Sequence, residues 1–220
     1  MKHIGIITAM QQEADIIITK YNLQKMQTLG MIEWYQWENN NTIITLILSG
    51  IWKIQASIAT SHLLSHYELD TIINIWIAGN LSDNGKVWDV FIINSCCQHD
   101  MYLPFDWEHL NYAKKPINLP TLDIKNIDDA FNIHIWACAT WDQFIDNELI
   151  LKEIKVKYNA DVVEMEAFSV LSVAREYDML EKCIIIKAIS DGANNNAIWD
   201  HMDNLDFAMN NSVKVLNTII

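Results

Sequence analysis

The sequence predicts an α/β domain whose central sheet is mixed but largely parallel. Two patterns indicate this fold class. Short apolar runs alternate with segments of helical periodicity, and one early pair of strands is joined by a tight turn. The length of 220 residues, with 51% apolar and 20% charged residues, is typical of a globular chain. We therefore expect one domain over residues 1–220.

The first quarter of the chain predicts a strand, a helix and a hairpin. Residues 4–8 form a short apolar run of the kind that lies buried in a parallel sheet. Residues 12–21 place their apolar side chains on one helical face. Residues 32–38 and 42–48 are expected strands, because they flank Asn39-Asn40-Asn41, a sequence typical of a hairpin turn.

The second quarter predicts a helix followed by two strands. Residues 53–67 are expected to be helical. The expected inner face of this helix consists of Ile54, Ile58, Leu63 and Leu64. Residues 71–77 and 87–94 are expected strands, separated by a loop that contains Gly79 and Gly85.

The second half continues the alternation of strands and helices. Strands are expected at 133–140 and 183–189, and helices at 147–158, 166–177 and 205–216. Ligands in such folds bind beyond the carboxyl ends of strands, so polar residues that follow strands are the candidates for a site.

The charge balance argues against a nucleic-acid partner. The chain has 28 acidic and 15 basic residues, a net charge of −13, and no basic run that would offset the repulsion of a phosphate backbone. Arg175 is the single arginine, so no group of several arginines can hold a phosphate.

The cysteines and the apolar runs bear on the compartment. Cys96, Cys97, Cys138 and Cys183 show no C-x-x-C spacing, which argues against a disulfide framework and a zinc site. The first residues lack the pattern of a signal peptide, and the longest apolar stretch, around residues 72–78, is too short to span a bilayer. We expect a cytoplasmic protein with no membrane partner.

Several common motifs are absent from the sequence. It contains no G-x-G-x-x-G, no G-x-x-x-x-G-K-[ST] and no G-x-S-x-G. His62 and His66 lie one helical turn apart and could share a metal ion, but no third ligand is evident, so an ordinary surface pair is the favoured interpretation. No metal or organic cofactor is expected.

Two acidic segments stand where predicted strands end. Residues 163–167, V-E-M-E-A, put two carboxylates at a strand-to-helix junction, and residues 188–191, A-I-S-D, end the most apolar strand. Apolar surroundings favour the protonated carboxyl group that a general acid needs. Taken singly, Glu166 is more simply explained as a helix N-terminal acid and Asp191 as a turn residue.

Together with the start of the chain, these segments resemble the 5′-methylthioadenosine/S-adenosylhomocysteine nucleosidases, within the wider nucleoside phosphorylase/hydrolase family. The similar motifs are A-M-Q-Q-E (9–13), S-G-I-W-K (49–53), A-G-N-L (78–81), K-V-W-D-V (86–90), D-Q-F-I (142–145), V-E-M-E-A (163–167) and K-A-I-S-D (187–191). The resemblance runs to about residue 215 and implies a three-layer α/β/α, nucleoside phosphorylase-like fold.

The resemblance implies hydrolysis of the N-glycosidic bond of methylthioadenosine and S-adenosylhomocysteine, which releases adenine and a thioribose through an oxocarbenium-like transition state. It implies Asp191 as the acid that protonates adenine and Glu13 as the base that deprotonates water. Glu166 would accept the ribose hydroxyls, Phe144 would stack on adenine, and the backbone of Ile145 would read the adenine edge. The other implied substrate-binding residues are Ala9, Met10, Ile51, Ala78, Gly79, Glu164, Met165 and Ser190.

The resemblance further implies that the chain forms a homodimer and acts as an enzyme of methionine salvage. The phosphorylases of this superfamily grip phosphate with arginines, so the single Arg175 favours hydrolysis. Two alternatives stay open: a nucleosidase for another 5′ group, such as aminodeoxyfutalosine or 5′-deoxyadenosine, or a nucleoside-binding homologue with impaired catalysis. Both alternatives are favoured by Trp76 and Trp141, which stand where the family has glycine. Two further departures are Lys187, which stands where the family has arginine, and the region 106–133, which is shorter than in the family.

Overall fold

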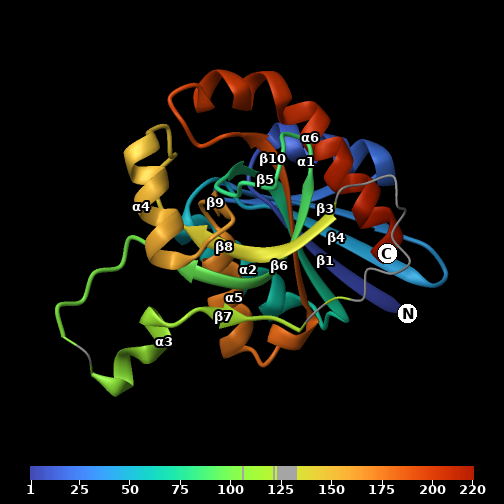
Figure 1. Cartoon of the computed structure of the whole chain (residues 1–220). Coiled ribbons are helices and arrows are strands. Elements are labelled where there is room, and N and C mark those ends of the chain that lie inside the picture. Colours follow the sequence, from blue (N-terminus) through green and yellow to red (C-terminus); the bar gives the residue numbers. More distant parts are fainter. Residues whose placement is uncertain (106, 121, 123–132) are drawn as a thin grey trace.

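A ten-stranded mixed sheet lies between two layers of helices (Figure 1). The computed structural model describes residues 1–105, 107–120, 122 and 133–220. The strands are β1 (Lys2–Thr8), β2 (Gln24–Leu29), β3 (Ile32–Glu38), β4 (Thr42–Leu48), β5 (Thr71–Asn80), β6 (Val90–Gln98), β7 (Ile117–Asn118), β8 (Ile133–Thr140), β9 (Val162–Glu164) and β10 (Cys183–Asp191). The predicted three-layer fold with a mixed sheet is confirmed.

The helical layers pack on opposite faces of this sheet. The helices are α1 (Gln11–Tyr21), α2 (Lys53–His66), α3 (Asn111–Lys114), α4 (Glu148–Tyr158), α5 (Ala167–Glu176) and α6 (Ala197–Ile219), with short 3₁₀ helices at Glu108–Leu110 and Leu180–Lys182. Helices α1 and α6 share one apolar core with the sheet, and α2 and α5 share the other (Figure 1).

The sheet topology brings distant strand ends together. Strand β1 pairs in parallel with β4 and β5, and β5 pairs in parallel with β10. The pairings β10–β6, β6–β8, β8–β9 and β9–β5 then close part of the sheet into a ring. Gly79 consequently lies beside both Asp191 and Val163, although these residues are far apart in the sequence.

Helix α2 buries a different face from the predicted one. Ile54 and Ile58 are 70% and 42% exposed, whereas Ala56, Ala59 and Leu63 are fully buried. The small alanines let α2 approach α5 closely, and their spacing is that of one helical face. The prediction was correct for Leu63 and for Leu64, which is partly buried against the same core, and wrong for the two isoleucines.

Several predicted boundaries are also corrected. Strands β5 and β10 run on to Asn80 and Asp191, so Ala78, Gly79 and Ser190 belong to strands. Strand β6 begins at Val90, later than predicted, and α6 begins much earlier than predicted. Strand β2 was missed because all of its residues are exposed and it has no apolar face. None of the described helices combines the length and apolar character that a bilayer crossing requires.

Candidate active site

A cavity opens where the carboxyl ends of β1, β5, β9 and β10 meet. It is lined by all of the site residues predicted from the sequence: Ala9, Met10, Glu13, Ile51, Ala78, Gly79, Phe144, Ile145, Glu164, Met165, Glu166, Ser190 and Asp191. The lining residues that were not predicted are Trp76, Ile77, Gln143, Val163 and His201. The structure thus brings the predicted residues together, and their chemical roles stay predictions.

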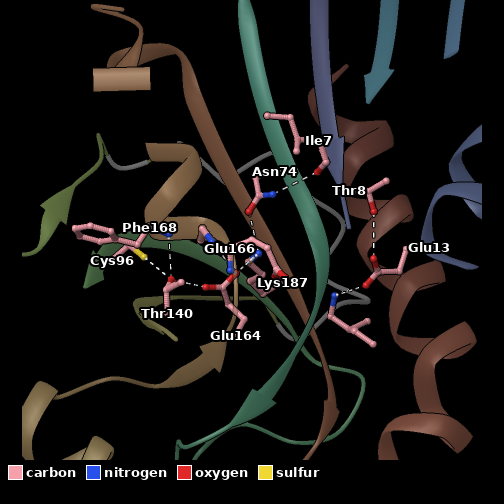
Figure 2. Close-up of polar contacts among 12 residues, drawn as sticks. Ile7, Thr8, Glu13, Asn74, Cys96, Thr140, Glu164, Glu166, Phe168 and Lys187 are labelled. Atoms are coloured by element: carbon pink, nitrogen blue, oxygen red, sulfur yellow. Dashed lines mark hydrogen bonds and ion pairs between the residues drawn. The ribbon is translucent and has the colours of Figure 1, made fainter. Parts of the chain in front are cut away.

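Glu13 reaches the cavity from the first turn of α1 (Figure 2). Its carboxylate accepts the backbone N–H of Met10 at 2.9 Å and the hydroxyl of Thr8 at 3.3 Å, and the N–H of Ile77 lies 3.4 Å from the other oxygen. Burial raises the pKa of Glu13, and these hydrogen bonds oppose the rise only in part. A carboxylate with a raised pKa is the better proton acceptor for a bound water.

Glu166 faces the cavity from the residue that precedes α5. The backbone N–H of Trp52 donates to its Oε1 at 2.8 Å, which ties the start of α2 to this carboxyl group. Trp52 and Gly50 have φ values of 84° and 85°, so the loop before α2 turns through conformations that favour glycine. Burial raises the pKa of Glu166 well above its ordinary value, and the neighbouring Glu164 adds to the rise.

We expect Glu166→Gln to stabilise the fold at neutral pH. Because the pKa of Glu166 is raised in the folded state, its contribution to stability is present below about pH 4.5 and is lost as the pH rises through the folded pKa. The glutamine side chain does not ionise, so the variant does not lose stability in this way as the pH rises. Its Tm at pH 7 should therefore be higher by about 2–4 °C, the shift that about 1 kcal/mol produces in a chain of this size. Thermal unfolding from pH 4 to 8 measures the effect; the exposed Glu68→Gln is the control. An unchanged pH profile would contradict the prediction.

Glu164 and Lys187 form a fully buried ion pair beneath the cavity (Figure 2). Lys187 Nζ lies 2.9 Å from Glu164 Oε2 and donates to Asn74 Oδ1 at 2.9 Å. The hydroxyl of Thr140 and the backbone N–H of Ala167 also donate to Glu164. Burial alone would raise the pKa of Glu164, but Lys187 and these hydrogen bonds outweigh it and hold the pKa below its ordinary value. Glu164 is therefore the carboxylate that stays ionised and orders the start of α5.

Trp76 and Lys187, both departures from the family pattern, contact each other. The ammonium of Lys187 lies 3.5 Å from the centre of a Trp76 ring, and both side chains are buried. A desolvated cation over an indole face is worth about 2 kcal/mol. The bulky tryptophan is thus packed beneath the site as a partner of the lysine, while part of it still lines the cavity.

Asp191 ends β10 with its carboxylate held on both oxygens. The hydroxyl of Ser190 donates to Oδ2 at 2.7 Å, and the backbone N–H of Ala193 donates to Oδ1 at 2.8 Å. A Cβ placed on Gly79 would lie 3.1 Å from Asp191 Oδ1 and 3.0 Å from the side chain of Ala193. A side chain at this position would require these neighbours to move by a few tenths of an ångström, so glycine suits the close approach of β5 to the end of β10.

The outer wall of the cavity joins the loop before α4 to the first turns of α6. The ring of Phe144 meets the ring of His201 edge to face at 5.4 Å between centroids. Gln143 and Val163 belong to the motifs D-Q-F-I and V-E-M-E-A, but no role at the site was predicted for them. His201 carried no such signal, since it lies in a stretch for which no helix was predicted.

Some residues singled out in the sequence lie away from the cavity. Trp141 packs edge to face on His99, at 4.6 Å between centroids, and neither residue lines the cavity. Burial lowers the pKa of His99 to about 4, so this ring is neutral at physiological pH. His66 bonds the carbonyl of His62 through Nδ1, and the described residues hold no cluster of three or more metal-ligating side chains.

Comparison with known proteins identifies a superfamily over almost the whole chain. A family model described as the phosphorylase superfamily matches residues 3–220. The chain belongs to this superfamily. One superfamily relative, a 5′-methylthioadenosine/S-adenosylhomocysteine nucleosidase from Buchnera aphidicola subsp. Schizaphis graminum (strain Sg), is 30% identical over 231 residues, which cover 99% of this chain and 95% of the relative.

Two solved superfamily structures share the fold. The nucleosidase of the same type from Neisseria meningitidis, in complex with methylthio-immucillin-A, has a TM-score of 0.89 at 24% identity and covers 100% of this chain and 98% of its own. The futalosine hydrolase of Helicobacter pylori strain 26695 has a TM-score of 0.87 at 21% identity and covers 99% and 96% of the two chains. At these identities, the likeness describes the fold alone.

Proposed function

We propose that this chain hydrolyses the N-glycosidic bond of 5′-methylthioadenosine and S-adenosylhomocysteine, and releases adenine and a thioribose. The observation that carries the proposal is the meeting of Glu13, Glu166 and Asp191 in one cavity, in a chain that is 30% identical to such a nucleosidase. The proposal treats residues 1–220 as one nucleosidase domain that needs no metal or organic cofactor.

Each of the three carboxyl groups has a distinct task in this reaction. The C1′–N9 bond breaks, and its electron pair leaves with adenine, which takes a proton at N7 from Asp191. A water attacks C1′ and gives a proton to Glu13, whose burial makes it a stronger base. Glu166 accepts the ribose hydroxyls, and these hydrogen bonds together with the positive charge that develops on the sugar favour its ionised form, which then stabilises the transition state.

The apolar lining supports binding of a flat base and a thio-substituted sugar. Phe144 offers a ring face for adenine, and the backbone of Ile145 is placed beside it to read the adenine edge. Met10, Ile51 and Met165 supply the apolar contacts for the sugar and its 5′ group.

The placement of the basic residues supports hydrolysis over phosphorolysis. Arg175 lies on α5, outside the cavity, and pairs with Glu176 at 3.4 Å. Lys187 is occupied by Glu164, Asn74 and Trp76. The part of the chain that the structure describes therefore offers phosphate no arginine in the cavity.

The deciding experiment is adenine release from methylthioadenosine by the purified chain, with and without added phosphate. Release at the same rate in both conditions is the expected result. Release that requires phosphate would overturn the argument from Arg175. No release, with methylthioadenosine still raising Tm, would show binding without turnover, since a ligand that binds only the folded state must stabilise it.

Trp76 favours a second candidate, a nucleosidase for another 5′ group. Part of its ring lines the cavity at a position where the family pattern has glycine, so its bulk favours a substrate of a different shape. Turnover of aminodeoxyfutalosine or 5′-deoxyadenosine, with none of methylthioadenosine, would select this candidate.

An exposed apolar face on and before α2 supports assembly as a homodimer. Ile51, Trp52, Ile54 and Ile58 are 42%, 58%, 70% and 42% exposed, which is unusual for large apolar side chains that lie this close together. Trp52 also binds Glu166, so a partner subunit on this face would steady the site.

We expect Ile54→Glu to convert the dimer to a monomer and to lower the rate of adenine release. A charge at this position cannot be buried in an apolar interface without a large desolvation cost. Light scattering coupled to size-exclusion chromatography measures the mass. Leu149→Glu, an equally exposed site on α4, is the control and should stay dimeric. A monomeric wild type would refute the assembly.

A cytoplasmic location and a place in methionine salvage complete the proposal. The four cysteines are free and buried, which suits a reducing compartment. The thioribose product retains the methylthio group, so the reaction would make this group available for the synthesis of methionine. Thiol titration of the native protein from its own cells, with no disulfide found, is the expected result.

A further inference from the structure

Asp191 is a buried acid that must regain a proton in every catalytic cycle. The residue is only 2% exposed, and bound product would close the remaining access from the cavity. If it protonates adenine as proposed above, it is left as an anion, while Glu13 holds the proton taken from water. Glu13, which is 1% exposed, exchanges its proton through the same cavity, so a second route that bypasses the cavity would let Asp191 regain a proton while product is still bound.

Ser190 contacts both Asp191 and His201, and the three side chains form a compact cluster in which His201 is the most exposed member. The hydroxyl of Ser190 is 2.7 Å from Asp191 Oδ2, and Nδ1 of His201 is 3.4 Å from that hydroxyl. The direct separation of His201 Nδ1 and Asp191 Oδ2 is 3.8 Å, too long for a hydrogen bond, so the hydroxyl is the bridge. The His201 side chain is 23% exposed and thus reaches solvent.

We propose that His201 and Ser190 form a proton relay that returns a proton from solvent to Asp191 after each turnover. This inference rests on the proposed nucleosidase function. Nε2 of His201 takes a proton from water, and Nδ1 passes a proton to the Ser190 oxygen while the Ser190 hydroxyl proton moves to Asp191 Oδ2. The protons balance: one enters from solvent at Nε2 and one reaches Asp191. The starting tautomer of His201 is restored by exchange with water, in which Nδ1 gains a proton and Nε2 loses one.

The surroundings of His201 suit this task. Imidazole is the side chain whose charge changes near neutral pH, so it can take and give a proton in each cycle. Among the described residues, Asp191 is the carboxylate within 4 Å of its ring, while Asp200 and Asp203 lie near it along α6. Phe144 packs edge to face on the ring and limits its orientation without adding a charge.

The test compares the first turnover with later turnovers in His201→Phe, with methylthioadenosine as substrate. The variant keeps a ring against Phe144 but cannot carry a proton. Enzyme that has stood in buffer has had time to take up the proton that each turnover consumes, so the first turnover should keep the wild-type rate. Later turnovers should slow by about 10²-fold or more, the lower end of the effect of a lost proton-transfer group. Rapid-quench measurement should thus show a burst of one adenine per site.

Added imidazole tests the same relay in His201→Ala, which opens space for the free base. We expect imidazole to restore the steady-state rate of this variant, and to leave unchanged the wild type and His62→Phe, a matched substitution remote from the site. His201→Gln tests whether hydrogen bonding without proton transfer suffices, and it should behave as His201→Phe does.

The outcomes separate the relay from the proposed function. Wild-type adenine release, combined with no burst in His201→Phe and no rescue by imidazole, would overturn the relay alone. A change confined to KM would do the same, because it would assign His201 to substrate binding. No adenine release from the wild type at any pH would overturn the proposed function and the relay with it.

Discussion

Asp191→Asn should lower the rate of adenine release by about 10²–10⁴-fold, the contribution of a general acid, while substrate binding is kept. The amide has the shape of the carboxyl group and can still accept the backbone N–H of Ala193, which lies 2.8 Å from Oδ1. It has no acidic proton to give to adenine, so the leaving group must depart as an anion. The loss should therefore fall on kcat and leave KM nearly unchanged.

Two measurements check this expectation. Adenine release gives kcat and KM, and the rise of Tm with methylthioadenosine reports binding without turnover. Asp161→Asn is the matched control, because Asp161 also accepts a backbone N–H, from Ala137 at 3.0 Å, and lies outside the cavity. Full activity in Asp191→Asn would remove this residue from the role of proton donor.

Lys187→Met should destabilise the fold by about 3–5 kcal/mol, because it leaves Glu164 buried without its ion-pair partner. At about 2–4 °C per kcal/mol in a chain of this size, Tm at pH 7 should fall by roughly 10 °C. Lys187 also donates to Asn74 and lies over Trp76, so the substitution unpairs the amide oxygen and removes the cation from the indole. Thermal unfolding measures the loss.

The pH dependence identifies the cause of this loss. The pKa of Glu164 is lowered in the folded state, so the stability from its ion pair is present above about pH 4.5 and is lost as the pH falls through the folded pKa. The difference between the wild type and Lys187→Met should therefore be largest at neutral pH and shrink in acid. The double variant Lys187→Met/Glu164→Gln should recover most of the stability, since neither charge of the buried pair remains. An equally unstable double variant would show that the packing of the Lys187 side chain, rather than its charge, stabilises the fold at this position.

Local sequence patterns predicted elements well where one face is strongly apolar or a capping residue is present. The strand at Ile133–Thr140 has the predicted bounds, and Asn147 caps α4 through its side chain where the helix was expected to start. The hairpin around Asn39 likewise has its predicted strands. These signals depend on neighbours within a few residues, so they can be read from the sequence.

The prediction of elements and buried faces was weaker where contacts between distant parts of the chain determine the structure. Strand β2 has only exposed residues and is held by pairing with β3. Helix α2 turns its alanines, rather than Ile54 and Ile58, toward the core, because these small side chains let α2 pack closely against α5. Helical periodicity alone does not tell which of two apolar faces a partner helix will cover.

The sequence by itself determined the fold class, the superfamily motifs and the candidate site residues, because each motif lies at a strand end or helix start that local patterns define. Only the tertiary structure decided three further points: the contact of Trp76 with Lys187, the outward face of α2, and the position of His201 beside Ser190. These depend on strand register, helix rotation and the docking of α6, which join residues far apart in the chain. Such contacts follow from the shape of the packed core, and no local run of residues encodes that shape.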